Sequence, residues 1–246
     1  MDRHASHHYL VARPVLVALV ATFFLAVAAS AAAAPAATVL TLSPQSAKVA
    51  WHAKLVLNGV LQEDVVPPLP LDQQTLEVQR SATSSGPWTT VGTITNTAGA
   101  YYSGAYVYSQ LADETWFWRM YYAGDTQWAA STSNVVKVGV SPVLGKPKCP
   151  KVMGVAQKFR VSGSLKPAFT PGLGGVKVKV QRYTAGKWQR YATRACRVSD
   201  SGVYSKYSVR LAISTPGKYR FYAVRPGSGD YASGRSEFSR SLHVMW

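Results

Sequence analysis

The heptapeptide Val176-Lys177-Val178-Lys179-Val180-Gln181-Arg182 decides the fold that we expect for this chain. Its side chains alternate between apolar and polar with a period of two, which is typical of a β-strand with one buried and one solvated face. Burial of the three valines places Lys177 and Lys179 together on the opposite face. We therefore expect a strand here whose solvated face is cationic.

The end of this stretch repeats an earlier segment, Leu76-Glu77-Val78-Gln79-Arg80, with a lysine where the earlier copy has Glu77. Further pairs of segments recur in the same order: Gly86-Pro87-Trp88 with Gly186-Lys187-Trp188, Ala98-Gly99-Ala100-Tyr101 with Ser201-Gly202-Val203-Tyr204, Thr115–Trp118 with Lys218–Phe221, and Gly124-Asp125 with Gly229-Asp230. A period near 100 residues is that of a whole domain, because solenoid repeats have periods of tens of residues.

The composition predicts an all-β fold. Tyr, Trp, Val and Thr are abundant, and long helix-periodic runs are absent. Each copy carries about seven short strand signals separated by turn signals, the pattern of an antiparallel β-sandwich of roughly 100 residues. We expect domains at 38–140 and 147–246 with a short proline-rich link between them. In each copy we expect an early strand, Ala53 to Leu61 and Phe159 to Leu165, which ends at Asn58-Gly59 in the first copy and at Ser162-Gly163 in the second.

The same patterns predict which side chains face the core and which close the turns. In the Thr115–Trp118 and Lys218–Phe221 segments, Trp116, Trp118, Tyr219 and Phe221 share the buried parity, whereas Arg220 and Tyr222 face water. Asp125 and Asp230 cap their own turns.

The N-terminal 1–34 segment has the features of a secretory signal peptide. Arg3 and Arg13 precede a continuous apolar run from Val15 to Ala29, and small residues follow up to Pro35. We expect cleavage after Ala33, which makes the mature protein secreted, either released or associated with the cell surface. An uncleaved membrane anchor is the alternative, since 15–34 is about long enough to span a bilayer.

The net charge of +16 is unevenly distributed. Residues 141–246 contain 20 Lys and Arg against three Asp and Glu, a net charge of +17, whereas residues 35–140 contain five against seven, a net charge of −2. A domain of such charge creates a positive potential over much of its surface. This excess of positive charge either keeps the protein soluble or forms a surface that binds polyanions. The candidate polyanion-binding residues are Lys177, Lys179, Arg182, Arg190, Arg194, Lys206, Arg210 and Arg220.

Three tyrosines, Tyr183, Tyr191 and Tyr222, are interleaved with these cations. They are either ordinary half-buried strand aromatics or platforms that stack on sugar rings or bases.

Cys149 and Cys196 are the two cysteines of the chain, and both lie in the second copy. Export favours a structural disulfide between them. A redox or nucleophilic role is the weaker alternative, because their spacing is far from Cys-x-x-Cys.

The sequence contains no recognisable catalytic or metal-binding motif. It lacks His-Glu-x-x-His, Gly-x-Ser-x-Gly, clustered Cys and His, and a phosphate-binding loop. His52 and the acidic pairs Glu63-Asp64 and Asp113-Glu114 are interpreted as surface groups. We therefore expect a non-enzymatic protein without cofactor or metal.

The order of five motifs, Ser162–Leu165, Lys177–Arg182, Gly186–Trp188, Ser201–Tyr204 and Thr215–Phe221, resembles the bacterial immunoglobulin-like repeats of secreted and surface proteins of actinobacteria. The resemblance covers most of 150–245 and, more loosely, 38–140. It implies a non-catalytic extracellular module used for adhesion, display or spacing. The antibody subtype is not matched, because the first copy has no cysteine and Cys149 precedes the first strand of the second.

Three functions remain as hypotheses. The leading one is a secreted tandem sandwich whose second copy associates with an anionic envelope polymer or polysaccharide. The second is a structural spacer without a ligand. The third, nucleic-acid binding, rests on basicity alone, and export argues against it. A membrane partner applies only to the uncleaved form, and the sequence does not specify an oligomeric state.

Overall fold

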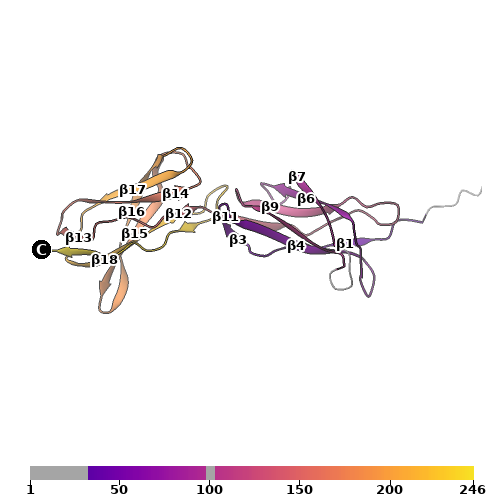
Figure 1. Cartoon of the computed structure of the whole chain (residues 1–246), viewed down its shortest axis with the longest axis horizontal. Coiled ribbons are helices and arrows are strands. Elements are labelled where there is room, and N and C mark those ends of the chain that lie inside the picture. The colour runs from indigo at the N-terminus through magenta and orange to yellow at the C-terminus, as the bar shows by residue number, and fades with distance from the viewer. Residues whose placement is uncertain (1–32, 98–102) are drawn as a thin grey trace, which may run out of the picture. The chain divides into compact units, whose positions relative to one another are not determined.

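The structure is a computed structural model that describes residues 33–97 and 103–246. Residues 1–32 of the expected signal segment and the expected turn at 98–101 lie outside the described residues. Every regular element in the described part of the chain is a β-strand, so the all-β prediction is confirmed (Figure 1). None of the described residues forms an apolar helix of membrane-spanning length.

Two sheets form the first copy. One sheet consists of β1 (Thr38–Leu40), β2 (Ser43–Pro44), β4 (Lys54–Glu63), β5 (Leu69–Pro70) and β8 (Ala105–Leu111). The other consists of β3 (Lys48–Ala50), β6 (Thr75–Ser81), β7 (Thr89–Thr95), β9 (Trp116–Tyr122), β10 (Ser131–Thr132) and β11 (Val136–Ser141). Their buried side chains meet in one apolar cluster that includes Leu57, Leu76, Trp118 and Met120.

The second copy is a nine-stranded sheet in the order β12-β14-β17-β16-β15-β18-β20-β13, with β19 beside β18. Its strands are β12 (Val143–Leu144), β13 (Val152–Gly154), β14 (Phe159–Lys166), β15 (Gly172–Thr184), β16 (Lys187–Asp200), β17 (Ser205–Leu211), β18 (Gly217–Arg225), β19 (Gly234–Arg235) and β20 (Leu242–Met245). The long β16 joins two layers, because it pairs with β15 along most of its length and with β17 from Arg197 onward. A second apolar cluster fills the space between these layers.

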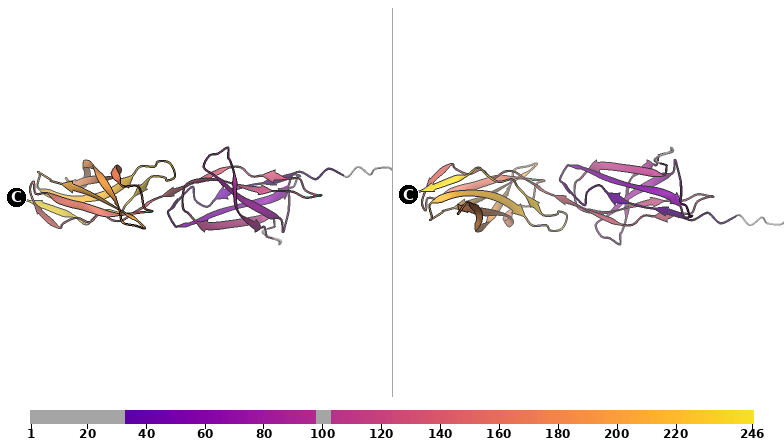
Figure 2. Two further views of the ribbon diagram at one scale, coloured as in Figure 1. Left: turned by 90° about the horizontal axis from the view of Figure 1, so that it is seen from above. Right: turned by 90° about the horizontal axis from the view of Figure 1, so that it is seen from below.

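The pairing of the strands makes each copy an Ig-like sandwich. In the first copy the leading segment pairs antiparallel with β4 and then parallel with β11; in the second it pairs antiparallel with β14 and then parallel with β20. This change of layer by the first strand, together with two layers of mainly antiparallel strands, is an Ig-like arrangement. Figure 2 shows the layered strands within each copy. The bounds 38–140 and 147–246 remain a prediction, and Pro35–Trp246 forms one compact unit.

The heptapeptide Val176–Arg182 lies in β15 with the predicted parity. Val176 and Val178 are 0% exposed and Val180 is 2% exposed, whereas Lys177 is exposed and Lys179 half-buried. The hairpin that follows is a two-residue loop in which Ala185 and Gly186 have φ values of 50° and 76°. Positive φ at both loop residues matches the twist of the paired strands, which explains the turn predicted at Gly186.

The strands expected over 53–61 and 159–165 are confirmed as β4 and β14, but the predicted strand ends at Asn58-Gly59 and Ser162-Gly163 are wrong, because both pairs lie inside these strands. These glycines provide room for a tyrosine of the neighbouring strand. A Cβ on Gly59 would lie 2.7 Å from Cζ of Tyr106, and one on Gly163 would lie 2.7 Å from Cε1 of Tyr207. Close approach, and not a turn, is what requires glycine at these positions.

Core parity is confirmed for the matched aromatic segments. Trp118, Tyr219 and Phe221 are at most 2% exposed, and Trp116 packs against the first core. The predicted cap is present at Asp125, whose Oδ1 accepts hydrogen bonds from the backbone N–H groups of Gln127 and Trp128. The carboxylate of Asp230 makes no such bond, and a different residue, Asp200, accepts one from the N–H of Gly202.

Candidate anion-binding faces of the second copy

The cations of the second copy are almost entirely unpaired. Among the described residues a single ion pair is formed, between Arg80 and Asp113 of the first copy, with an N–O distance of 3.2 Å. The 20 Lys and Arg of residues 141–246 therefore have no carboxylate within ion-pair distance. No nearby carboxylate neutralises their positive charge, so the positive potential that attracts anions is retained.

Six of the eight predicted polyanion-binding residues divide between two surfaces. Lys177, Lys179, Arg190 and Arg220 lie on the outer surface of β15, β16 and β18, together with Lys218 and Arg235; we name this surface the β15 face. Lys206 and Arg210 lie on the outer surface of the other layer, on β17. The eight residues therefore do not form one site.

Arg182 and Arg194 belong to neither surface. The guanidinium of Arg182 points inward, where Nη2 donates to the carbonyl of Pro216 at 2.9 Å and Nε is buried without a partner. Arg194 lies opposite the buried Val178, on the inner side of β16, and is exposed because β17 pairs with β16 only from Arg197 onward. Its Nη1 donates to the carbonyl of the adjacent Thr193.

Arg220 is packed between two aromatic rings and does not face water freely. Its guanidinium lies 4.4 Å from the ring centroid of Trp188 and 3.7 Å from that of Phe238, and its Nε donates to Oε1 of Gln181 at 2.7 Å. Desolvation in this position lowers the pKa of Arg220, and nearby Arg235 lowers it further. The expectation that Arg220 and Tyr222 face water is correct for the side of the sheet but wrong for their exposure, because both are half-buried, Tyr222 against Phe238 and Arg235.

The first copy contains the same packing arrangement. Arg119 lies 4.4 Å from the ring centroid of Trp88, and its Nε donates to Oε1 of Gln79 at 2.7 Å. Because the arrangement is present in the weakly charged copy as well, we interpret Arg220 as part of the framework of the fold. It joins the sheet through cation–π and hydrogen-bond contacts.

The three tyrosines interleaved with the cations also pack on neighbouring rings. Tyr183 contacts Trp188, Tyr191 contacts Tyr219 and Tyr222 contacts Phe238, each edge to face with centroids 5.2–5.3 Å apart. Such packing is that of ordinary strand aromatics. Tyr183 and Tyr191 remain 45% and 40% exposed.

The other layer carries a hollow of about 520 Å³ on β14 and β17, which we name the serine groove. β14 and β17 run side by side in Figure 1. The groove is lined by basic side chains, hydroxyl groups and the ring of Tyr204, and none of its lining residues is acidic. The lining residues include Lys146, Lys148, Arg160, Ser162, Ser164, Ser199, Tyr204, Lys206 and Ser208.

Of the residues that line this groove, only Lys206 was predicted from the sequence as a polyanion-binding residue, together with the neighbouring Arg210. A signal was present in Phe159-Arg160-Val161-Ser162, where the buried Phe159 and Val161 alternate with Arg160 and Ser162. That alternation assigns Arg160 and the serine to the solvated face. The pairing of β14 with β17, which brings them beside Lys206, is visible only in the fold.

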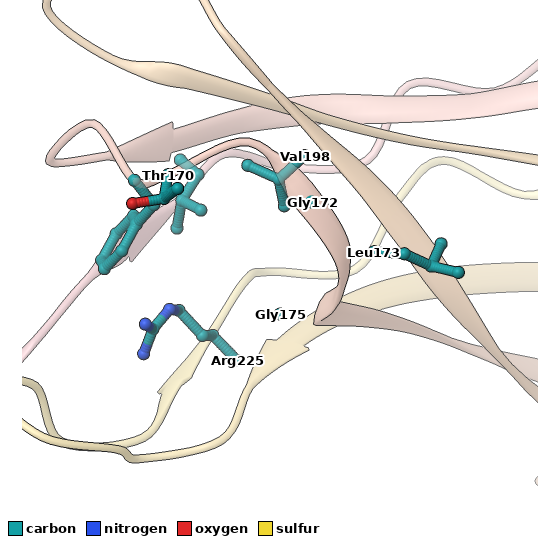
Figure 3. Close-up of a pocket in the computed structure, with 8 residues that line it drawn as sticks. Thr170, Gly172, Leu173, Gly175, Val198 and Arg225 are labelled. Carbon is teal, nitrogen blue, oxygen red and sulfur yellow. The ribbon is translucent and has the colours of Figure 1, made fainter.

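A smaller cavity of about 260 Å³ opens beside Phe169, Gly172 and Leu173 (Figure 3). Arg225 points into it, but its guanidinium already lies 4.1 Å from the ring centroid of Phe169 and donates to the carbonyl of Pro226. Desolvation lowers the pKa of Arg225. With its one cation held by protein groups, this cavity is a weaker candidate for an anion than the serine groove.

The predicted disulfide is not formed. Cys149 and Cys196 are both buried free thiols, 5% and 0% exposed. The Sγ of Cys149 faces the carbonyl of Arg240, and Cys196 lies on β16 opposite Val176 in the core. Burial raises the pKa of both thiols, that of Cys196 to about 11, which opposes formation of a reactive thiolate.

Within residues 33–97 and 103–246 no group of three His, Cys, Asp or Glu side chains is arranged to hold a metal ion. His52 stacks on Trp51 with ring centroids 3.8 Å apart.

Comparison with known proteins adds little to this description. No protein-family model matches the chain, and no curated protein matches it. Among solved structures, the crystal structure of the ICAM-5 D1-D4 ectodomain fragment matches with a TM-score of 0.41 and 13% sequence identity, covering 84% of this chain and 53% of that one. The chain thus spans about half the length of that fragment, and a likeness this weak carries no argument about function. The Ig-like assignment rests on the strand pairing described above.

Proposed function

We propose that this chain is an exported, non-enzymatic bacterial protein of two Ig-like sandwiches, of the kind found in actinobacteria, whose second copy binds an anionic polymer or polysaccharide of the cell envelope. The observation that carries the proposal is the absence of carboxylate partners for the 20 cations of residues 141–246. Unpaired charges on neighbouring strands repel one another, so this surface is electrostatically unfavourable until anions approach it.

The first copy supports the proposal as an internal comparison. It is also an Ig-like sandwich and has the same glycine–tyrosine contact and the same arginine–tryptophan packing, yet its net charge is −2. The fold therefore does not need the positive charge of the second copy. A charge that the fold does not need is best explained by an anionic partner.

The test is the binding of the mature chain, 34–246, to immobilised acidic and neutral polysaccharides as a function of salt concentration. We expect binding to the acidic polymers, weakening steeply as salt rises because exposed charges are screened, and no binding to neutral dextran. Binding that is absent from all acidic polymers, or that does not respond to salt, refutes the proposal and leaves the structural spacer as the explanation.

A further inference from the structure

We propose that the serine groove, and not the β15 face, is the anion site, and that it takes phosphate or sulfate ester groups carried on a polymer. Its anchor is the guanidinium of Arg160, which lines the groove, together with that of Arg210, which is paired with Arg160 beside the groove. This inference rests on the proposed function and names the site and the ligand chemistry for it. Four steps carry it.

The first step is the position of the two arginines. Arg160 on β14 and Arg210 on β17 are directly paired across the strands, so their Cα atoms are about 5 Å apart. Both side chains are exposed, and neither makes a hydrogen bond or ion pair with any described residue. Like charges directly opposite on one sheet face destabilise the pair, and an anion bound between them removes that repulsion.

The second step is the row of hydroxyl groups between the cations. Ser162 on β14 pairs with Ser208 on β17, and the row continues to Lys148 on one side and Arg197 on the other. In the next row Lys206 lies between Ser164 and Ser199. The hydroxyls of Ser162, Ser164 and Ser208 are half-buried and have no hydrogen-bond partner among the described residues. These hydroxyl groups can therefore donate hydrogen bonds to a ligand.

The third step concerns the chemistry that fits this set of donors. An arginine offers a planar fork that matches carboxylate or phosphate, and each serine offers one further O–H. A carboxylate presents two oxygens. A phosphate or sulfate monoester presents three oxygens in addition to the one that links it to its carrier. Two guanidiniums flanked by unpartnered hydroxyls supply more donors than a carboxylate accepts, so the tetrahedral oxyanion is the better match.

The fourth step is the first copy, in which the strand pairs that correspond to these rows are uncharged. There β4 and β8 pair as β14 and β17 do, and the position of the Arg160–Arg210 pair is taken by Val56 and Ser109. Asn58 pairs with Val107, and Val60 with Ala105, where the second copy has the serine rows. The β15 face, in contrast, has its central arginine held by Trp188, Phe238 and Gln181.

The experiment compares two variants of the mature chain with the same change in charge. Arg160→Gln/Arg210→Gln alters the serine groove, and Lys177→Gln/Lys179→Gln alters the β15 face. Binding is measured by calorimetry at fixed salt to three probes: a dextran that carries phosphate monoesters, a sulfated polysaccharide and polygalacturonate, which carries only carboxylates. We expect the arginine variant to lose about tenfold or more in affinity for the phosphate and sulfate polymers, and the lysine variant less than about threefold.

Thermal unfolding provides the folding control and a second readout. We expect the arginine variant to unfold at the same temperature as the wild type or higher, because repulsion has been removed. Inorganic phosphate and sulfate should raise the unfolding temperature of the wild type more than chloride at equal ionic strength, as a bound ligand does, and this difference should vanish in the arginine variant. Ser162→Ala/Ser208→Ala should weaken binding of the phosphate and sulfate polymers while binding of polygalacturonate changes little.

The outcomes separate this inference from the proposed function. An equal loss of affinity in the two variants, or a larger loss in the lysine variant, refutes the assignment of the anion site to the serine groove but leaves the proposal of polyanion binding intact. Affinity for polygalacturonate equal to that for the esters overturns the ligand class. Failure of the wild type to bind any of the three polymers overturns the proposed function itself.

Discussion

Replacing Gly163 by alanine tests the contact that holds the floor of the serine groove. Gly163 lies in β14 between Ser162 and Ser164, and the ring of Tyr207 on β17 packs against its Cα. A methyl group on Gly163 would overlap Oη and Cζ of Tyr207 and would lie 2.7 Å from Cε1. An ordinary carbon–carbon contact is about 3.5–4.0 Å, so the ring has to move by about 1 Å.

The size of the effect follows from the surroundings of that ring. Tyr207 is 0% exposed, and its Oη donates to the carbonyl of Gly145 at 2.7 Å. Overpacking a core contact costs about 1–3 kcal/mol, and a buried hydrogen bond lost in the shift adds about 1 kcal/mol. We therefore expect Gly163→Ala to reduce the free energy of unfolding by about 2–4 kcal/mol. For a domain of this size that corresponds to a fall of roughly 10–20 °C in the unfolding temperature.

The assay is calorimetric and urea-induced unfolding of the mature chain, analysed with more than one transition because two copies are present. Gly175→Ala is the matched control: no atom lies within 4 Å of its Cβ, and its φ is not among the positive ones. Its effect should stay within about 0.5 kcal/mol. Gly59→Ala should destabilise the first copy as Gly163→Ala does the second, through Tyr106, whose Oη bonds to the carbonyl of Thr41.

A double-mutant cycle decides whether the tyrosine is the cause. Tyr207→Leu removes the outer ring atoms, so Gly163→Ala should be much less damaging in that background than in the wild type, a coupling of about 1 kcal/mol or more. If Gly163→Ala leaves the unfolding temperature within about 2 °C of the wild type, or if the two changes are simply additive, glycine at this position has another explanation and our reasoning about close approach fails.

Three further predictions concern the framework and the thiols. Arg220→Ala should lower the urea midpoint of the second copy by an amount equivalent to about 1–3 kcal/mol, because it removes two ring contacts and the hydrogen bond to Gln181. Arg119→Ala should likewise lower the urea midpoint of the first copy. If neither variant is less stable than the wild type, these arginines are not part of the framework of the fold. Alkylation of the denatured, unreduced chain should increase its intact mass by two alkyl groups, one each at Cys149 and Cys196. A mass that does not change would show that the two cysteines are joined in a disulfide. Burial raises the pKa of Cys196 to about 11 in the folded state, so between about pH 8.5 and 11 the folded protein keeps this proton and the unfolded chain loses it. The difference in the free energy of unfolding between the wild type and Cys196→Ala should therefore be constant below about pH 8.5 and should fall by about 2–3 kcal/mol as the pH rises towards 11. A difference that does not depend on pH would contradict the burial of this thiol.

The parity of side chains within a strand was predictable from the sequence, and the partner of each strand was not. The alternation of valine and lysine predicts the buried and solvated faces of β15, which the exposures of Val178 and Lys177 confirm. It does not show that β16 pairs with β15 along one part and β17 along another. The predicted cations therefore appeared to belong together, whereas the fold places them in two layers.

Two further errors have the same physical origin, a neighbour distant in the chain. Glycine at Gly59 and Gly163 signals a turn or a close contact equally well, and the tyrosine that decides between them lies in a later strand. Arg220 has the parity of a solvated residue, and its packing depends on Trp188 and Phe238. Local pattern gives the side on which a residue lies, and tertiary contacts decide what covers it.

The difference between the two copies is informative because their shared contacts are so similar. If the positive charge served solubility alone, any distribution of cations over the second copy would suffice, and the hydroxyls beside them would carry no meaning. Yet the paired Arg160 and Arg210 adjoin unpartnered serine hydroxyls at the position where the first copy has Val56 and Ser109. Repulsion between opposite arginines opposes folding, and hydroxyls contribute no apolar burial, so neither feature strengthens the sandwich. Both are accounted for by one ligand that accepts hydrogen bonds and carries negative charge.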